Sequence, residues 1–218
     1  MSEGAVDTSA ARRDRRTEIL EAATRLFCER SYHQTKLDDV ALEIGFTKPA
    51  IYYYFESKEE ILFEIHNRLI LLALERMDAI AHGDAGPAAR LRTMLRTHMA
   101  HVLEKRDAIK VFYSEQGLLS EEREAVIRAN RDRYEWIFHD VYREGVERGE
   151  FQPFDPRIAI GALLGACRSV HMWVPRIGEV DESSAVEQIA DLLTYGYVTD
   201  DLKRAGSGLA SAGRGAHA

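Results

Sequence analysis

The spacing of apolar residues is the feature that most constrains the fold of this 218-residue chain. Apolar residues recur three and four positions apart along almost its whole length, and no run of four or more residues alternates as a half-buried strand requires. One such helical face in the first third of the chain is made of Ile19, Ala22, Ala23, Leu26 and Phe27. The sequence therefore predicts an all-α fold.

Composition and cysteine usage are typical of a globular protein of the reducing cytoplasm. The chain is 45% hydrophobic and carries a net charge of -7. Cys28 and Cys167 lie far apart without CxxC spacing, which indicates neither a disulfide framework nor a zinc finger. The first ten residues lack the apolar core of a secretory signal, and the longest strongly apolar stretch, 158–167, is about half of a membrane span. We therefore expect a cytoplasmic protein without a membrane partner.

Start and stop signals place the individual helices. Thr47 and Pro49 suit the start of a short helix, Gly45 suits the end of the one before it, and Ser57 with Glu60 forms a capping-box sequence. The predicted helices cover 15–30, 37–44, the short segment after Thr47, 57–81, 87–105, 107–115, 120–148, 155–174 and 183–202.

The segment from 15 to 60 has the pattern of a helix-turn-helix, in which two short helices joined by a tight turn pack on a preceding helix. The third helix turns Ile51, Tyr54 and Phe55 inward. Its outward face carries Lys48, Pro49, Tyr52 and Tyr53. Adjacent exposed tyrosines have no packing role, whereas phenol hydroxyls, a lysine and a helix N-terminus together are donors for phosphates and base edges. Because the net charge is acidic, any DNA contact must be local.

Residues 19–62 carry a closely spaced set of motifs. It comprises Ala22-Ala23 before Leu26-Phe27, then Thr35, Asp39-Val40-Ala41, Gly45, Lys48, Ile51-Tyr52, Tyr54-Phe55 and Ser57-Lys58-Glu59. With this set the segment resembles the DNA-binding domain of the TetR family of bacterial transcriptional regulators. Ser31 departs from the glycine usual after the first helix, and Pro49 stands where a small residue is commoner.

The resemblance implies DNA contacts at positions of this sequence. Phosphate contacts would fall on Thr35, Thr47, Tyr52 and Lys58. Base-edge contacts would fall on Lys48, Pro49, Ala50 and Tyr53. The basic run 11–16 upstream is either a solvated charge run or an arm for the minor groove.

The chain is thus expected to have four parts. They are a flexible basic arm at 1–14, a helix-turn-helix DNA-binding domain at 15–57, a larger helical ligand-binding and dimerisation domain at 58–202, and a disordered tail at 203–218. In the larger domain, the predicted helix 155–174 is apolar all round and has a small-residue face. The resemblance implies a homodimer through the last two helices, with interface residues Gly161, Ala162, Gly165, Ala166, Ser169, Leu192, Leu193 and Tyr197. The alternative is a purely intramolecular core.

Polar residues on apolar faces of the larger domain are candidates for a ligand site. They are His98, Asn130, Tyr134, Arg168 and His171. Each of them can instead be a satisfied core polar group. His98 and His101 have metal-ligand spacing, but no third ligand is placed by the sequence, so we predict neither a metal nor a cofactor. The segment 111–174 is more weakly similar to the TetR branch that senses acyl-CoA thioesters, whose phosphates would need a cation such as Arg168 or Arg176.

The sequence favours a ligand-responsive homodimeric transcriptional repressor. It would bind a palindromic double-stranded DNA operator and be released by a small lipophilic effector, with an acyl-CoA of fatty-acid or sterol catabolism as the leading class. One alternative is a regulator without a small-molecule effector. Another is a helical enzyme or carrier for lipophilic substrates, which ranks low because no Ser-His-Asp order, nucleotide loop or zinc signature is present.

Overall fold

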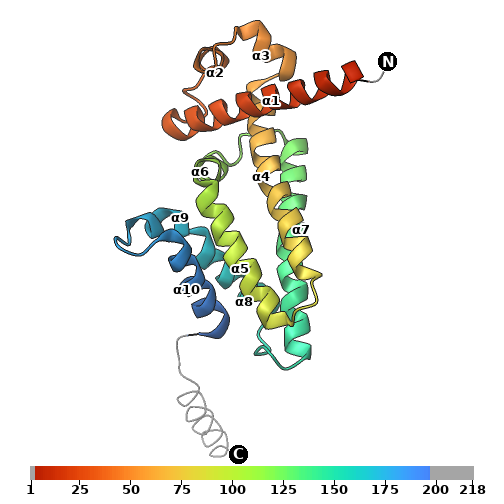
Figure 1. The fold of residues 1–218 in the computed structure, drawn as a ribbon, viewed down its shortest axis with the longest axis vertical. Coiled ribbons are helices and arrows are strands. Elements are labelled where there is room, and N and C mark those ends of the chain that lie inside the picture. The colour runs from red at the N-terminus through yellow and green to blue at the C-terminus, as the bar shows by residue number, and fades with distance from the viewer. Residues whose placement is uncertain (1–2, 197–218) are drawn as a thin grey trace, which may run out of the picture.

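The computed structural model describes residues 3–196, and every regular element in that range is a helix (Figure 1). The all-α prediction is therefore confirmed. The elements are α1 (Glu3–Arg30), α2 (Leu37–Glu43), α3 (Lys48–Tyr54), α4 (Lys58–Ala81), α5 (Pro87–Glu104), α6 (Arg106–Ser114), α7 (Glu121–Glu147), α8 (Pro156–Arg168), α9 (Val170–Trp173), the 3-10 helix η1 (Val174–Arg176) and α10 (Glu182–Tyr195).

Two hydrophobic cores divide the molecule. The first joins α1, α2 and α3 to the start of α4, around Phe27, Ile51 and Phe55. The second fills the space between α4, α5, α7, α8 and α10, around Met94, Leu95 and Phe138. Figure 1 shows α1 lying across the ends of α4 and α6, so that α2 and α3 stand at one end of an elongated helical body. The three-helix domain and the larger helical domain are thus confirmed as the two units of the fold.

The turn between α2 and α3 follows from its glycine. Gly45 adopts a φ of +68°, which glycine enters without a Cβ clash, and the N–H of Phe46 donates to the Ala41 carbonyl at 2.7 Å to close the end of α2. Pro49 lies in the first turn of α3, where its missing N–H costs no hydrogen bond. Thr47 occupies the N-cap position of α3, but contrary to prediction its side chain makes no capping hydrogen bond.

The cap at the start of α4 differs from the predicted capping box in one hydrogen bond. The Ser57 hydroxyl accepts from the Glu60 N–H at 3.0 Å, as expected. The Glu60 carboxylate, however, accepts from the N–H of Glu56 at 2.6 Å instead of returning to Ser57. One carboxylate therefore fixes the turn before the cap.

Two predicted boundaries differ in the structure. α1 begins at Glu3, so the basic run 11–16 and most of the predicted arm at 1–14 belong to a helix. The predicted helix 155–174 is divided at Ser169 into α8 and α9, and it ends in η1. Tyr197 and the predicted tail at 203–218 lie outside the described residues.

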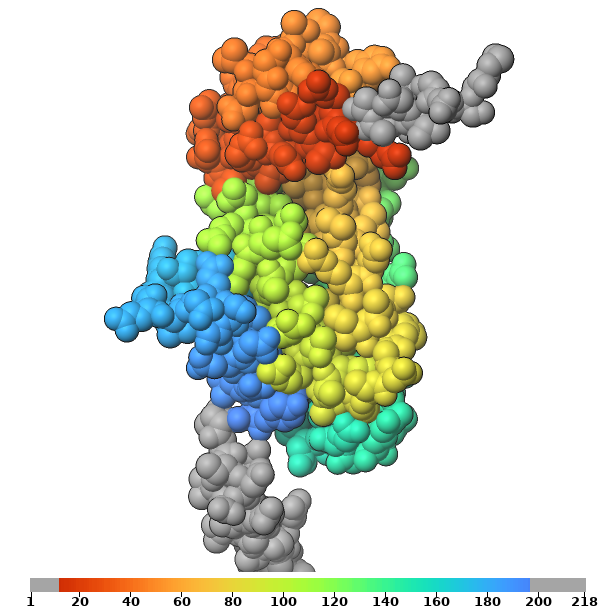
Figure 2. Space-filling view, in the orientation of Figure 1, coloured from red at the N-terminus to blue at the C-terminus, as the bar shows by residue number. Residues whose placement is uncertain are grey.

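The stretch Pro156–Arg176 is long and apolar enough, by length and composition alone, to cross a membrane, with a mean hydropathy of 1.3. This exceeds the ten-residue estimate made from the sequence. Only 22% of its most apolar 18-residue window is buried in the chain. It packs on the core through Ile160 and Cys167 and contains Arg168. Figure 2 shows the segment from α9 to α10, in blue, projecting from one side of the body.

Candidate nucleic-acid interface and ligand cavity

The outward face of α3 presents two tyrosines to solvent. Tyr52 is 49% exposed and Tyr53 66% exposed, as the sequence predicts. Lys48 and Pro49 are exposed on the same helix, and Ala50 is half-buried. The ammonium group of Lys48 lies 3.0 Å from an Asp38 carboxylate oxygen. Because both side chains are exposed, this ion pair contributes little to stability and leaves Lys48 available to another anion.

Two arginines of α1 lie against aromatic rings of this region. The Arg12 guanidinium lies 5.3 Å from the Tyr53 ring centroid, and that of Arg15 lies 5.5 Å from the centroid of Phe46. The basic run is therefore packed beside α3 through cation–π contacts. It is part of the same surface and not a separate arm.

Thr35 does not present its side chain to solvent. It is 1% exposed, and its hydroxyl lies 2.9 Å from the Ser31 carbonyl and 3.2 Å from that of Leu26. Those bonds close the loop after α1, where Ser31 adopts a φ of +71°. The phosphate contact implied for the Thr35 side chain is thus corrected to a structural role, because its hydroxyl is buried and used.

Lys58 is also engaged within the protein. Its ammonium group donates to the carbonyls of Tyr32 at 2.8 Å and Thr35 at 3.0 Å, and it lies 4.0 Å from the Tyr32 ring centroid. Partial burial lowers the pKa of Lys58 below its ordinary value. With two of its three donors used, Lys58 fastens α4 to the α1–α2 loop, so its implied phosphate contact competes with two hydrogen bonds inside the protein.

A cavity of about 260 Å³ lies in the larger domain between α4, α5, α6, α7 and α8. Its lining is mostly apolar, with histidine, tyrosine and charged residues among it. The residues are Leu69, Ile70, Ala73, His98, His101, Val102, Ile109, Phe112, Tyr113, Arg131, Tyr134, Glu135, Gly161, Leu164, Gly165 and Arg168. Three of the predicted ligand residues are therefore brought together here: His98, Tyr134 and Arg168.

The inner wall of the cavity holds a neutral imidazole. His98 Nδ1 lies 2.7 Å from the Tyr134 hydroxyl, and burial lowers the pKa of His98 to about 4. Burial also raises the pKa of the Tyr134 phenol. The pair is thus uncharged at neutral pH and suits an uncharged ligand group.

The outer side of the cavity is cationic. Arg131 and Arg168 are exposed, and the Arg168 guanidinium lies 5.1 Å from the Tyr113 ring centroid. Glu135 contributes the opposing charge. An apolar interior with arginines at the solvent side suits a molecule with an apolar body and an anionic head.

Two predicted ligand residues lie outside the cavity lining. The Asn130 amide donates to the Asn67 side chain at 2.9 Å and thereby ties α7 to α4. His171 Nδ1 lies 2.9 Å from the Arg168 carbonyl, beyond the break after α8. Both are satisfied polar groups, which was the alternative interpretation. The α4 and α6 lining residues were missed because apolar core residues carry no ligand signal in the sequence.

The small-residue face of α8 is exposed in this chain, whereas the sequence predicted a helix buried all round. Gly161, Ala162, Gly165 and Ala166 are exposed, and a Cβ added to either glycine would meet no other atom within 4 Å. Leu192 on α10 is 45% exposed, while Leu193 packs against the core and Ser169 is half-buried. Gly161 and Gly165 also line the cavity, so the exposed face of α8 adjoins it.

The larger domain touches the helix-turn-helix unit through α6 as well as α4. Val111 of α6 is fully buried in the first core, and a Glu115 carboxylate oxygen accepts from the Tyr32 N–H at 3.1 Å. Lys110 donates to the Cys28 carbonyl at 2.9 Å. Because Ile109 and Phe112 of α6 also line the cavity, α4 and α6 both connect the cavity to the helix-turn-helix unit.

These features together define a helix-turn-helix regulator with a separate ligand-sized cavity. Family models agree: "Bacterial regulatory proteins, tetR family" matches residues 19–65, and "Tetracyclin repressor-like, C-terminal domain" matches residues 84–197. The chain belongs to the TetR family of bacterial transcriptional regulators. It is accordingly a DNA-binding transcriptional regulator and not an enzyme.

Three relatives illustrate the range of similarity. A TetR/AcrR-family regulator from Thermobifida fusca YX-ER1 is 45% identical, with 85% of this chain and 100% of that chain covered and a TM-score of 0.70. The transcriptional repressor KstR2 of Mycobacterium tuberculosis is 30% identical over 142 residues, which are 64% of this chain and 70% of that protein. AibR, solved with isovaleryl coenzyme A and operator DNA, is 25% identical, with 84% of this chain and 100% of that chain covered and a TM-score of 0.75.

Proposed function

We propose that this protein is a cytoplasmic homodimeric repressor that binds a palindromic operator and is released when a small lipophilic effector enters the cavity. The single observation that best supports this is that α4 extends from the end of the DNA-reading unit to the cavity. This one continuous helix begins beside α3 at Lys58 and contributes Leu69, Ile70 and Ala73 to the cavity wall. A ligand that displaces α4 would therefore change the placement of α3.

The proposed DNA contacts follow the exposed surface of α3. Lys48, Pro49, Ala50 and Tyr53 face base edges, while Tyr52 and the free hydroxyl of Thr47 contact phosphates. A dimer would set two such surfaces about 34–36 Å apart, or a multiple of that, to read two half-sites. In a chain with a net charge of -7, one such surface alone provides little counterion release. Two surfaces bound at once would provide more and so raise the affinity for DNA.

We assign the dimer interface to the open face of α8 together with α10. Exposed small residues on α8 permit close approach of a second helix, and exposed Leu192 adds apolar area beside them. The same assignment accounts for the apolar stretch 156–176 without a membrane. The predicted residue Tyr197 would extend this interface beyond the described residues.

An acyl-CoA thioester is the effector class that best suits the cavity. The volume of about 260 Å³ lies just below the range of about 300–1,000 Å³ typical of small-molecule sites, so it suits an acyl group and not a whole coenzyme A. The phosphates would then lie outside, near Arg131 and Arg168. AibR, solved with isovaleryl coenzyme A, is consistent with this class.

Selection of duplexes from a random-sequence pool by the full-length protein tests the proposal. We expect an enriched palindrome bound by two protomers or a multiple of two, and a dimer by sedimentation at micromolar concentration. Ala166→Glu, on the exposed α8 face, should give monomers and lose the palindrome, whereas Ala89→Glu, exposed on α5, should change neither. Monomers in the wild type with no enriched sequence would contradict the proposal.

A further inference from the structure

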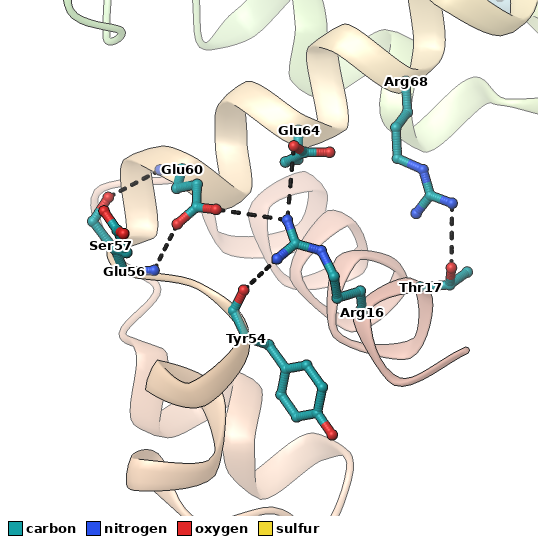
Figure 3. A network of polar contacts seen from close by, with 8 residues as sticks. All are labelled: Arg16, Thr17, Tyr54, Glu56, Ser57, Glu60, Glu64 and Arg68. Atoms are coloured by element: carbon teal, nitrogen blue, oxygen red, sulfur yellow. Dashed lines mark hydrogen bonds and ion pairs between the residues drawn. The ribbon is translucent and has the colours of Figure 1, made fainter. Parts of the chain in front are cut away.

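Arg16 of α1 contacts both α3 and α4 (Figure 3). Its guanidinium donates to the carbonyl oxygen of Tyr54, the last residue of α3. The same group lies 3.6 Å from a Glu60 carboxylate oxygen and 3.7 Å from one of Glu64, both on α4. Its central carbon lies 4.1 Å from the ring centroid of Phe55, in the turn between the two helices.

These contacts suit the end of a short helix. The last carbonyls of α3 have no partner within the helix, and a cation at a helix C-terminus is favoured by the helix dipole. Arginine can serve several acceptors at once because its planar fork holds five donors in a fixed geometry. With 28% of its side chain exposed, Arg16 is withdrawn from solvent compared with Arg15 at 53%.

The turn beneath Arg16 is fixed to α4 by the same residues. One oxygen of Glu60 faces Arg16, while the other accepts from the Glu56 N–H at 2.6 Å. Ser57 caps α4 through the Glu60 N–H. Because Phe55 is fully buried under the guanidinium, α3 cannot turn relative to α4 without breaking the contacts of Arg16.

We propose that Arg16 is a positioning residue that sets the angle between α3 and α4, and so transmits movements of α4 to the DNA-reading surface. This role differs from that of a basic-run cation that contacts a DNA phosphate. The inference rests on the proposed reading of DNA by α3. It gives Arg16, one arginine of the basic run 11–16, a structural role within the protein.

Affinity for two duplexes distinguishes the two roles. A phosphate contact contributes equally to selected and random duplexes and to the salt dependence, whereas a positioning contact contributes to the selected duplex alone. We expect Arg16→Gln to weaken binding to the wild-type-selected duplex about 10- to 100-fold, as loss of a charge-assisted hydrogen bond implies, with little change for random duplex and the same salt slope. Arg16→Lys retains the charge but not the fork, and it should show the same loss to a smaller extent.

The control is Arg13→Gln, which removes an exposed arginine from the same helix. It should leave the ratio of selected to random affinity unchanged. Amide hydrogen exchange adds a structural measurement: in Arg16→Gln the amides of residues 53–57 should exchange faster, while those of α5 should not. Glu64→Gln weakens the bridge from the α4 side, so it provides the same test if Arg16 variants fold poorly, with a smaller loss of the same kind.

Equal losses on both duplexes with a lower salt slope would show that Arg16 contacts phosphate and would overturn the inference. An unchanged affinity ratio with unchanged exchange at 53–57 would also overturn it. If the wild type selects no duplex at all, the proposed function fails and this inference fails with it. If the wild type selects a palindrome and only the Arg16 prediction fails, the proposed function stands.

Discussion

The Lys58 ammonium nitrogen lies 2.8 Å from the Tyr32 carbonyl oxygen, so the first residue of α4 is fastened to the loop that follows α1. The contact joins the helix that reaches the cavity to the loop that precedes α2. The family resemblance implies that Lys58 contacts a DNA phosphate. In the structure, its ammonium group binds backbone carbonyls within the DNA-binding unit.

Replacing Lys58 by methionine should therefore reduce stability more than it reduces salt dependence. Two backbone carbonyls lose a charged donor, which should lower the free energy of unfolding by about 1–3 kcal/mol in urea melts. Affinity for the selected duplex should fall, with the slope of log affinity against log salt unchanged. A slope reduced by about one per subunit, with unchanged stability, would restore the phosphate-contact assignment.

The two exposed tyrosines of α3 should have separable effects on DNA binding. Tyr53→Ala should change the sequence preference of the protein, because a good base-edge contact is worth about 1–3 kcal/mol of discrimination. Tyr52→Phe should weaken selected and random duplexes alike, because it removes only a phosphate donor. Repeating the duplex selection with each variant measures both effects. A changed preference in Tyr52→Phe, or an unchanged one in Tyr53→Ala, would reverse the assigned roles.

Stability should fall as the pH drops from about 6.5 towards 4. Burial lowers the pKa of His66, packed 4.9 Å from the Phe112 ring centroid, and that of His98 to about 4 each. The unfolded chain takes up these protons near pH 6.5, whereas the folded chain resists until about pH 4, so protonation favours unfolding within this window. Each histidine should contribute on the order of 3 kcal/mol.

Urea melts across that pH range measure the effect. His66→Leu should remove part of the loss, because the substituted side chain does not titrate, whereas His98 and His101, whose pKa values burial also lowers, still do. His33→Gln, which replaces an exposed histidine, is the matched control and should retain the full loss. A pH dependence that is the same in His66→Leu and in the wild type would contradict the assignment.

Ser31→Gly should stabilise the protein. Ser31 holds a φ of +71°, a left-handed conformation that costs a residue with a Cβ about 1–2 kcal/mol, whereas glycine adopts it freely at a smaller entropic cost. We expect a gain of about 0.5–1 kcal/mol by thermal or urea unfolding. Gln34→Gly, in the same loop, should instead destabilise, and a loss of stability in Ser31→Gly would show that its geometry is not strained.

Much of the fold was predictable because its signals are local. The helical spacing, Gly45 and the Ser57 cap depend on neighbours within a few residues, and they predict most helix boundaries. The exposure of Tyr52 and Tyr53 follows from the same periodicity. The division after α8 at Ser169 was not predictable, because an apolar run does not show where a helix bends.

Asn130 and Lys58 were misjudged for the same reason. Whether a polar side chain faces a cavity or a partner depends on helices that are distant in sequence. Asn130 on α7 bonds Asn67 on α4. Lys58 is held by carbonyls more than twenty residues upstream. No local pattern contains these pairings.

Linkage between the cavity and DNA binding is the most direct test of the proposed mechanism. The selected duplex should be titrated with the full-length protein by fluorescence anisotropy, without and with a saturating acyl-CoA from a series of short-chain, long-chain and steroid-like thioesters. At least one member should weaken duplex affinity by about 5- to 150-fold, the usual range of allosteric coupling. Arg168→Ala should bind the duplex normally without thioester and require a higher thioester concentration for release. If thioesters that bind the protein by calorimetry leave duplex affinity unchanged, or if none binds at all, the cavity is not the effector site proposed here.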